Sequence, residues 1–284
     1  MKLSTILLVP AMAITPALCA TKLANQGTVS FDCDDMPEVC LNMCFGVHCR
    51  NGRYSRTFTY DGAAKNTLQA RRKAAGCGQN NRCSQLPPWK GTGTSCDEFP
   101  FANTREADQG GQYNRCVPGG QNNRQGGRLA GFLNRVKAKK GPKEETAPYL
   151  YNIAFLNIGQ IQHCSAAAPN PCDADANLWM GRVPAKNGGP WQPRARRSAA
   201  MQPTFNHYIS KRGEFFTSAA EMSPGDKLYH PYMIREAEAK LNATLDEDAR
   251  NAIYADPDSY DLIEDEMERI ATGGEILNAT STST

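Results

Sequence analysis

The sequence predicts an α+β protein in which a small, disulfide-stapled core is followed by an acidic, mainly helical C-terminal segment. Three observations lead to this prediction. The chain of 284 residues has 11 cysteines, and ten of them lie between residues 33 and 172. Strand-like and helix-like patterns alternate within this cysteine-rich part. The net charge divides along the chain, with +12 over residues 21–235 and −10 over residues 236–284.

The first 20 residues have the pattern of a secretory signal peptide. A positive charge at Lys2 precedes a short apolar run over 6–20, which ends in small residues. The run is interrupted by Pro10 and Pro16 and is too short to span a bilayer. We therefore expect a secreted protein with no membrane attachment after the signal is removed.

The cysteines predict a disulfide framework, because an even number behind a secretory signal indicates oxidised pairs. The short spacings favour Cys77–Cys83 and Cys164–Cys172 as local bonds, although the spacing alone leaves the connectivity open. The ten cysteines expected to form five disulfides are Cys33, Cys40, Cys44, Cys49, Cys77, Cys83, Cys96, Cys116, Cys164 and Cys172.

Local patterns predict the elements of the core over residues 21–183. Residues 29–62 are expected to hold short extended runs, with a strand over 56–60 that ends at an Asp-Gly turn signal. A short helix is expected over 67–75. A longer helix is expected over 121–139, because Leu129, Phe132, Leu133 and Val136 form one apolar face. The apolar run over 149–158 predicts a buried strand.

The remainder predicts a different organisation. Residues 184–231 are rich in Pro, Gly and Arg over their first half and are expected to be a linker or exposed loop. Residues 232–284 are expected to form an acidic helical tail with a disordered end. Asn242 and Asn278 each begin an N-glycosylation triplet, as expected for a secreted surface.

An R-x-R-R sequence at residues 194–197 has the form that secretory proteases cleave. One hypothesis is that the acidic tail is a pro-segment that shields a basic site until cleavage occurs there. The alternative is that the tail serves solubility and that these arginines add to a binding surface.

The charge and composition narrow the classes of function. A basic, disulfide-rich secreted body indicates a polyanionic partner, such as nucleic acid, anionic polysaccharide or a membrane surface. The chain has no P-loop, GxGxxG or HExxH sequence. The histidines His48, His163, His207 and His230 are scattered, and structural roles are the better expectation for them.

One pair of motifs is more specific. Cys96-Asp97-Glu98-Phe99-Pro100-Phe101-Ala102 is followed by Val117-Pro118, and then by Asn122 and Gln125-Gly126 at the start of the amphipathic helix. Over about residues 30–170 this pattern resembles the NucA/NucB deoxyribonuclease family, small secreted non-specific endonucleases with cysteine-rich eukaryotic relatives. The resemblance implies a ββα-metal nuclease core, in which strands and a helix converge on one divalent cation and one activated water.

The resemblance also implies roles for individual residues. Asp97 matches the essential acid that deprotonates or orients the water, and Glu98 is its neighbour near the metal. The helix begins with Gln121-Asn122 where the bacterial pattern has Glu-Asn, so Asn122 is an expected amide ligand and Gln121 a weaker one. A site with fewer carboxylates should bind Mg²⁺ more weakly, or prefer Mn²⁺.

Phosphodiester hydrolysis also needs positive charge near the phosphate. Arg124 and Arg128 lie one helical turn apart and could clamp it, with Gln125 between them as a further contact to nucleic acid. The alternative is that these arginines form a solvated helix face. Contacts to the backbone rather than to bases would make cleavage largely independent of sequence.

Together these observations predict a secreted, metal-dependent DNase that uses Mg²⁺ or Mn²⁺, acts on DNA or also on RNA, and needs no obligate protein partner. Two alternatives stay open. One is a catalytically inactive relative that binds nucleic acid, and the other is a disulfide-rich effector or toxin with a protein partner.

Overall fold

The described part of the chain is a mixed α+β structure built around a closed barrel. The structure is a computed structural model, and it describes residues 23–49, 57–140, 148–159, 161–164, 172–181, 183–184, 205–244 and 246–276. The expected signal peptide, the R-x-R-R sequence and Asn278 lie outside these ranges. Within them, no helix is long and apolar enough to cross a bilayer.

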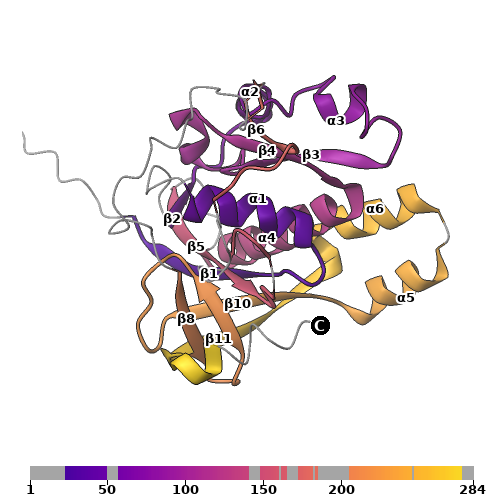
Figure 1. The fold of residues 1–284 in the computed structure, drawn as a ribbon. Coiled ribbons are helices and arrows are strands. Elements are labelled where there is room, and N and C mark those ends of the chain that lie inside the picture. The colour runs from indigo at the N-terminus through magenta and orange to yellow at the C-terminus, as the bar shows by residue number, and fades with distance from the viewer. Residues whose placement is uncertain are drawn as a thin grey trace, which may run out of the picture.

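Six strands close the barrel in the order β1-β10-β11-β8-β9-β5, because β5 also pairs with β1 (Figure 1). The pairings of β1 with β5 and with β10 are parallel, and the other pairings are antiparallel. A seventh strand, β2, pairs with the first half of β5. The bounds are β1 Asn25–Asp32, β2 Thr57–Tyr60, β5 Tyr149–Leu156, β8 Asn206–Ser210, β9 Phe215–Ser218, β10 Lys227–Met233 and β11 Tyr260–Ile270.

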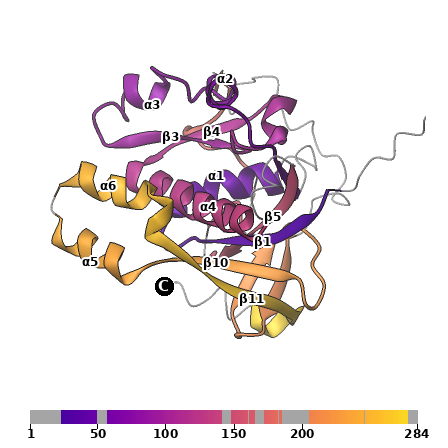
Figure 2. The same ribbon diagram turned by 180° about the vertical axis from the view of Figure 1, so that it is seen from behind.

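A smaller antiparallel sheet, in the order β3-β4-β6-β7, lies on the other side of two helices. In Figures 1 and 2, α1 and α4 lie between this sheet and the barrel, and α5 and α6 flank α4 at one end. The strands are β3 Thr94–Phe99, β4 Tyr113–Pro118, β6 Leu178–Met180 and β7 Val183–Pro184. The helices are α1 Pro37–His48, α2 Lys65–Ala74, α3 Arg82–Gln85, α4 Gly119–Lys140, α5 Arg235–Ala243 and α6 Glu247–Ala255, with short 3-10 helices at Arg105–Gln109 and Pro257–Ser259.

The strongest sequence patterns are confirmed. The four apolar residues of the expected long helix are all buried on α4, and Phe132 packs against Tyr151 of β5 and Tyr229 of β10. The apolar run at residue 149 forms β5, which has barrel neighbours along both edges. The expected short strand and short helix correspond to β2 and α2. Apolar periodicity therefore located the elements that form the central packing.

One helix was not expected. Residues 29–62 were predicted to hold short extended runs, but α1 occupies Pro37–His48 within that range. Pro37 stands at its first turn, where a missing N–H costs nothing. Nine of its 12 residues are buried, because α1 lies between two layers, and it therefore shows no polar face in the sequence.

All ten cysteines form disulfides, but the two local bonds that we favoured are wrong. Cys77 pairs with Cys96 and Cys83 with Cys116, so β3 and β4 are each joined to the chain around α2 and α3. The other bonds are Cys33–Cys40, Cys44–Cys164 and Cys49–Cys172. Cys44–Cys164 and Cys49–Cys172 join α1 to the chain after β5. These cysteines come close together only because the unexpected helix α1 forms.

The C-terminal segment is not mainly helical, which corrects the predicted fold class. The range expected to be a linker contains β8, β9 and most of β10, and the acidic range contains β11 as well as α5 and α6. In β11, the more exposed Glu264, Glu266 and Glu268 alternate with the buried Asp265 and Met267, as in a strand with one face toward the interior. High charge masked this alternation in the sequence.

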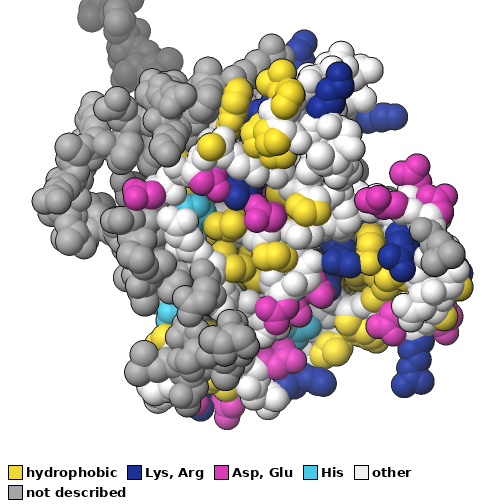
Figure 3. All heavy atoms as spheres, turned by 45° about the vertical axis from the view of Figure 1, so that its right-hand side comes forward, with side chains coloured by type: hydrophobic (Ala, Val, Ile, Leu, Met, Phe, Trp, Pro, Cys, Tyr) yellow, Lys and Arg dark blue, Asp and Glu magenta, His cyan; other side chains and the backbone are white. Residues whose placement is uncertain are grey.

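The acidic residues of β11 are paired with basic residues elsewhere. Asp261 and Glu264 form ion pairs with Arg135 and Lys139 of α4. On the face that Figure 3 shows, basic and acidic side chains are interspersed and do not gather into one basic field. The division of charge along the sequence is therefore not a division in space.

This arrangement predicts that cleavage after Arg197 does not release the C-terminal part. Strands β8–β11 supply four of the six barrel strands, so the two pieces should stay together by strand pairing. A protein cut there should elute as one species in native size-exclusion chromatography. It should separate in denaturant without reductant, because every described disulfide joins cysteines before residue 173. Release of the C-terminal piece under native conditions would instead support the pro-segment hypothesis.

Candidate active site

The β3–β4–α4 unit brings the motif residues together. Strands β3 and β4 pair with Asp97 opposite Arg115, and α4 begins directly after β4. The Nδ2 of Asn122, in the first turn of α4, donates to the Oγ of Ser95 (2.6 Å) and to the carbonyl of Cys96 (3.3 Å). These bonds fix the opening turn of the helix against β3, one residue from Asp97.

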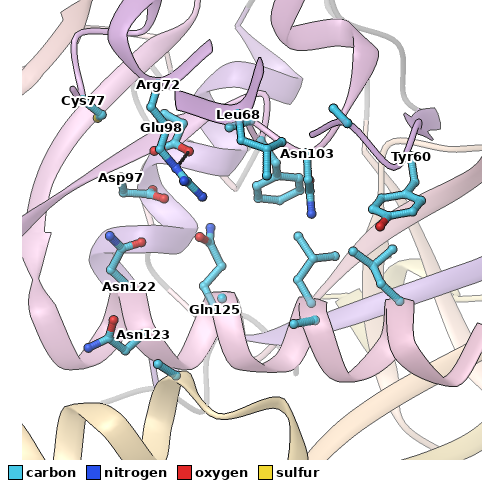
Figure 4. Close-up of a pocket in the computed structure, with 18 of the residues that line it drawn as sticks. Tyr60, Leu68, Arg72, Cys77, Asp97, Glu98, Asn103, Asn122, Asn123 and Gln125 are labelled. Carbon is cyan, nitrogen blue, oxygen red and sulfur yellow. Dashed lines mark ion pairs between the residues drawn. The ribbon is translucent and has the colours of Figure 1, made fainter. Parts of the chain in front are cut away.

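A cavity of about 490 Å³ lies between α2, β3 and α4. Figure 4 shows a polar end, where Arg72, Asp97, Glu98, Asn122 and Gln125 point toward one another. The other end is more apolar and carries Tyr60 and Leu68. The cavity therefore combines acids, amides and a cation in a partly enclosed space.

Asp97 is almost fully buried, with 2% of its surface exposed. Its Oδ2 accepts a hydrogen bond from the Nδ2 of Asn42 (2.9 Å), a buried residue of α1 that also donates to the Asp97 carbonyl (3.1 Å). Burial raises the pKa of Asp97 from 3.8 to about 8, and the nearby Glu98 adds to this, while the hydrogen bond from Asn42, the neighbouring amide of Gln125 and the charge of Arg115 act against it. The side chain is thus held in place and titrates near neutral pH.

Glu98 is the second acid of the cavity. Burial raises its pKa to about 7, although the guanidinium of Arg72 lies 3.4 Å from its Oε1 and lowers it. Neighbouring residues of a strand point to opposite faces, yet both acids line the cavity. The reason is that β3 is an edge strand of its sheet, so the cavity reaches both of its faces around that edge.

The oxygens of this end can hold a hard divalent cation. Because the Nδ2 of Asn122 is engaged with β3, its Oδ1 is directed into the cavity near Asp97 (Figure 4). Asp97 is buried and Glu98 is partly buried, and the raised pKa of each carboxyl means that nearby positive charge does not offset the cost of burying it. Carboxylate and amide oxygens are the ligands that Mg²⁺ and Mn²⁺ take in proteins. The residues present therefore fit such a cation.

Three predicted site residues lie elsewhere. The Oε1 of Gln121 accepts a hydrogen bond from the backbone N–H of Glu38 (3.0 Å), at the start of α1, and Gln121 does not line the cavity. Arg124 and Arg128 contact Asp35, and Arg124 also donates to the hydroxyl of Tyr254 (2.6 Å). At 100° per residue, positions 121, 124 and 128 follow a different line along α4 from positions 122, 125 and 129.

Two residues of the site were not identified from the sequence. Arg72 supplies the cation of the cavity from α2, and Asn42 orients Asp97 from α1. Arg72 stood in a predicted helix, but nothing in the local pattern indicated which charged residue of that helix would meet β3. Asn42 belongs to the helix that the sequence did not indicate. Gln125, predicted as a contact to nucleic acid, lies beside Asp97 in the cavity.

Comparison with known families agrees with this geometry. The model of the family described as deoxyribonuclease NucA/NucB matches residues 43–145. This match confirms the resemblance over residues 43–145, and it implies deoxyribonuclease activity for that part of the chain. The match includes β3, β4 and α4 and does not reach β1, β5 or β8–β11. Searches of curated proteins and of solved structures found no significant match.

The raised pKa of Asp97 predicts a pH-dependent stability of the cation-free protein. The folded state holds a proton on Asp97 that the unfolded state releases between about pH 4 and pH 8, so the unfolding free energy contributed by this group falls as pH rises through that window. Asp97→Asn should remove this loss. In the presence of chelator it should melt above the wild type near pH ~9, with the difference shrinking toward pH ~4.

Glu98 is present in both proteins, so its own titration largely cancels in that comparison. Thermal melts followed by circular dichroism across the pH range would measure the difference. A gap in melting temperature that does not change with pH would show that Asp97 titrates normally in the folded chain.

Proposed function

We propose that this protein is a secreted, metal-dependent endonuclease that hydrolyses DNA phosphodiester bonds with little regard to sequence. The single observation that carries the proposal is that buried Asp97 and partly buried Glu98 face the Asn122 amide on the opening turn of α4. The order of the elements, two antiparallel strands followed directly by a helix, is that of a ββα-metal core. The family match over the same residues supports this assignment.

Asp97, Glu98 and Asn122 would hold Mg²⁺ or Mn²⁺. When bound, the cation would polarise the scissile phosphate and stabilise the charge that develops on the leaving oxygen. Asp97 would accept the proton of the attacking water, since a general base works best when its pKa lies near the working pH. Asn42 keeps the carboxylate in one orientation, which is what positioning a water molecule requires.

Arg72 would provide the positive charge for the phosphate. Its side chain is half exposed and reaches the polar end of the cavity, where it is paired with Glu98. A guanidinium can bind two phosphate oxygens at once. In this role it replaces Arg124 and Arg128, whose guanidinium groups are engaged on another side of α4.

The rest of the cavity offers a path for the polynucleotide. Lys137 lies 5.3 Å from the ring centre of Tyr60, and both line the far end. A cation beside an aromatic ring can contact a neighbouring phosphate and stack on a base without reading its edge. Such contacts are consistent with sequence-independent cleavage.

Secretion and glycosylation belong to the same proposal. Five disulfides suit an oxidising compartment, and Asn242 is exposed on α5 where an acceptor must be accessible. Glycosylation of Asn278 stays a prediction from the sequence.

A second candidate is a catalytically inactive relative that binds DNA. The observation that favours it is the position of Gln121, which leaves α4 with amide oxygens alone at the polar end of the cavity. Fewer carboxylates weaken the hold on a hard cation. The two candidates differ in one result, because an inactive relative would retard DNA and leave it intact.

Plasmid nicking tests the proposal. Purified protein with Mg²⁺ or Mn²⁺ should convert supercoiled DNA to open circles, and chelator should stop the reaction. Asp97→Asn should lower the rate by about 100-fold or more, the scale expected for loss of a general base. Asp34→Asn, which removes an exposed acid, is the matched control and should cut normally. A folded Asp97→Asn protein that cuts at the wild-type rate would remove Asp97 from the mechanism.

The placement of the arginines gives a second prediction. Arg72→Gln should slow cleavage by about 10-fold or more, because it removes the cation nearest the expected phosphate. Arg124→Gln changes the same residue type on the other side of α4 and should leave the rate within a few-fold of wild type. The comparison uses initial nicking rates at saturating cation, with melting temperatures to verify folding. Equal losses in both variants would contradict the positions that we assign to these side chains.

A further inference from the structure

A second group of ligand-type side chains lies at one end of the barrel, outside the family match. His230 is on β10, Asp265 is on β11, and Glu214 is in the turn between β8 and β9. The Nε2 of His230 lies 3.3 Å from the Oε2 of Glu214 and 3.8 Å from the Oδ2 of Asp265. None of the three lines the nuclease cavity.

Two of the atoms in this group are buried without a hydrogen bond. His230 is 7% exposed and Asp265 is 6% exposed. The Nε2 of His230 and the Oδ2 of Asp265 have no hydrogen-bond partner among the described residues. The Oδ1 of Asp265 accepts from the backbone N–H of Glu266 (2.8 Å), so only Oδ2 is left to face His230. Buried polar atoms are nearly always satisfied, which indicates a missing ligand.

The contacts of Ser30 allow the tautomer of His230 that a metal ligand needs. When the Oγ of Ser30 donates to the carbonyl of Tyr229 (3.2 Å), it accepts from the Nδ1 of His230 (2.9 Å). In that tautomer the proton sits on Nδ1, and the lone pair of Nε2 faces the two carboxylates. A histidine whose second nitrogen donates to a fixed acceptor is the usual arrangement of a metal ligand.

Three acceptors that face one another require either a second proton on the imidazole or a cation. A cation bound between them would satisfy the Nε2 of His230 and the Oδ2 of Asp265 at once. A serine hydrolase arrangement does not fit, because Ser30 is only 2% exposed.

We infer that His230, Asp265 and Glu214 bind a divalent transition-metal cation of the Zn²⁺ class, at a site separate from the nuclease cavity. One imidazole and two carboxylates suit Zn²⁺ better than Mg²⁺ or Ca²⁺, which prefer oxygen ligands alone. Glu214 is half exposed and, with His230 and Ser30, lines a groove of about 450 Å³, so water can complete the coordination.

Such a cation would join three parts of the barrel. It would hold the β8–β9 turn against β10 and β11, where the barrel end otherwise places two acids beside an imidazole. Binding to the folded state alone stabilises a protein by mass action. The site would therefore act on the stability of the C-terminal strands.

Zn²⁺ titration calorimetry on chelator-treated, full-length protein tests the inference. We expect wild type to bind one more Zn²⁺ per chain than His230→Gln, and Glu214→Gln to bind it at least about 10-fold more weakly. His207→Gln changes a histidine on β8, the strand next to β11, that hydrogen-bonds Thr217 and has no carboxylate partner among the described residues; it should bind as wild type does. Added Zn²⁺ should also raise the melting temperature of wild type more than that of Glu214→Gln.

The comparison with the nuclease site separates the two proposals. Asp97→Asn should keep this Zn²⁺ site, and His230→Gln should keep plasmid nicking with Mg²⁺. If His230→Gln does not fold, Glu214→Gln decides the matter, because its side chain is half exposed on a turn. Zn²⁺ stoichiometry and affinity that are the same in Glu214→Gln as in wild type would overturn the inference.

Discussion

The packing of α4 is the interaction on which the rest of the structure depends. Its apolar face is buried against the barrel, with Phe132 between Tyr151 and Tyr229. Once that face is fixed, the helix geometry determines every other direction along it. On a second side, Gly127 allows α6 to approach so closely that a Cβ would lie 2.2 Å from the carbonyl of Tyr254. Asn122 and Gln125 stand on the same side of α4 as the apolar residues, one to two turns nearer its start, where they face Asp97 instead of the barrel.

The second constraint is the burial of charge beside this helix. An acid with a pKa raised to about 8 is held at a cost in stability that a structural residue would avoid. At the Asp97 carboxylate, the protein supplies a hydrogen bond from the amide of Asn42 rather than a direct ion pair. This keeps the carboxylate oriented and incompletely neutralised, a state that suits a cation site and does not serve packing. The local cost is therefore a reason to regard the cavity as functional.

The sequence predicted the parts that follow from local pattern or from a motif. Apolar periodicity located α4, a continuous apolar run located β5, and the Cys-Asp-Glu-Phe-Pro block identified Asp97 as a candidate site residue. The prediction from sequence failed where packing against a distant part of the chain determines the structure. The fully buried α1 has no amphipathic signal, so Asn42 and two disulfides were missed with it. The charged strand β11 was read as helix, and its role in closing the barrel depends on partners far away in the chain.

The barrel also reduces the number of basic side chains that are available to attract a polyanion such as DNA. Net charge counted along the sequence treats every arginine and lysine as available, but Arg135 and Lys139 are paired with β11, and Arg128 with Asp35. Each paired group contributes little to attracting DNA, because its acidic partner cancels the field beyond a Debye length. Two cations line the cavity: Arg72, which is paired with Glu98 at the polar end, and Lys137, which lies beside Tyr60 at the other end. Attraction to DNA should therefore be concentrated along that cavity, and a divalent cation bound by Asp97 and Glu98 would add to it by offsetting the charge of the two acids.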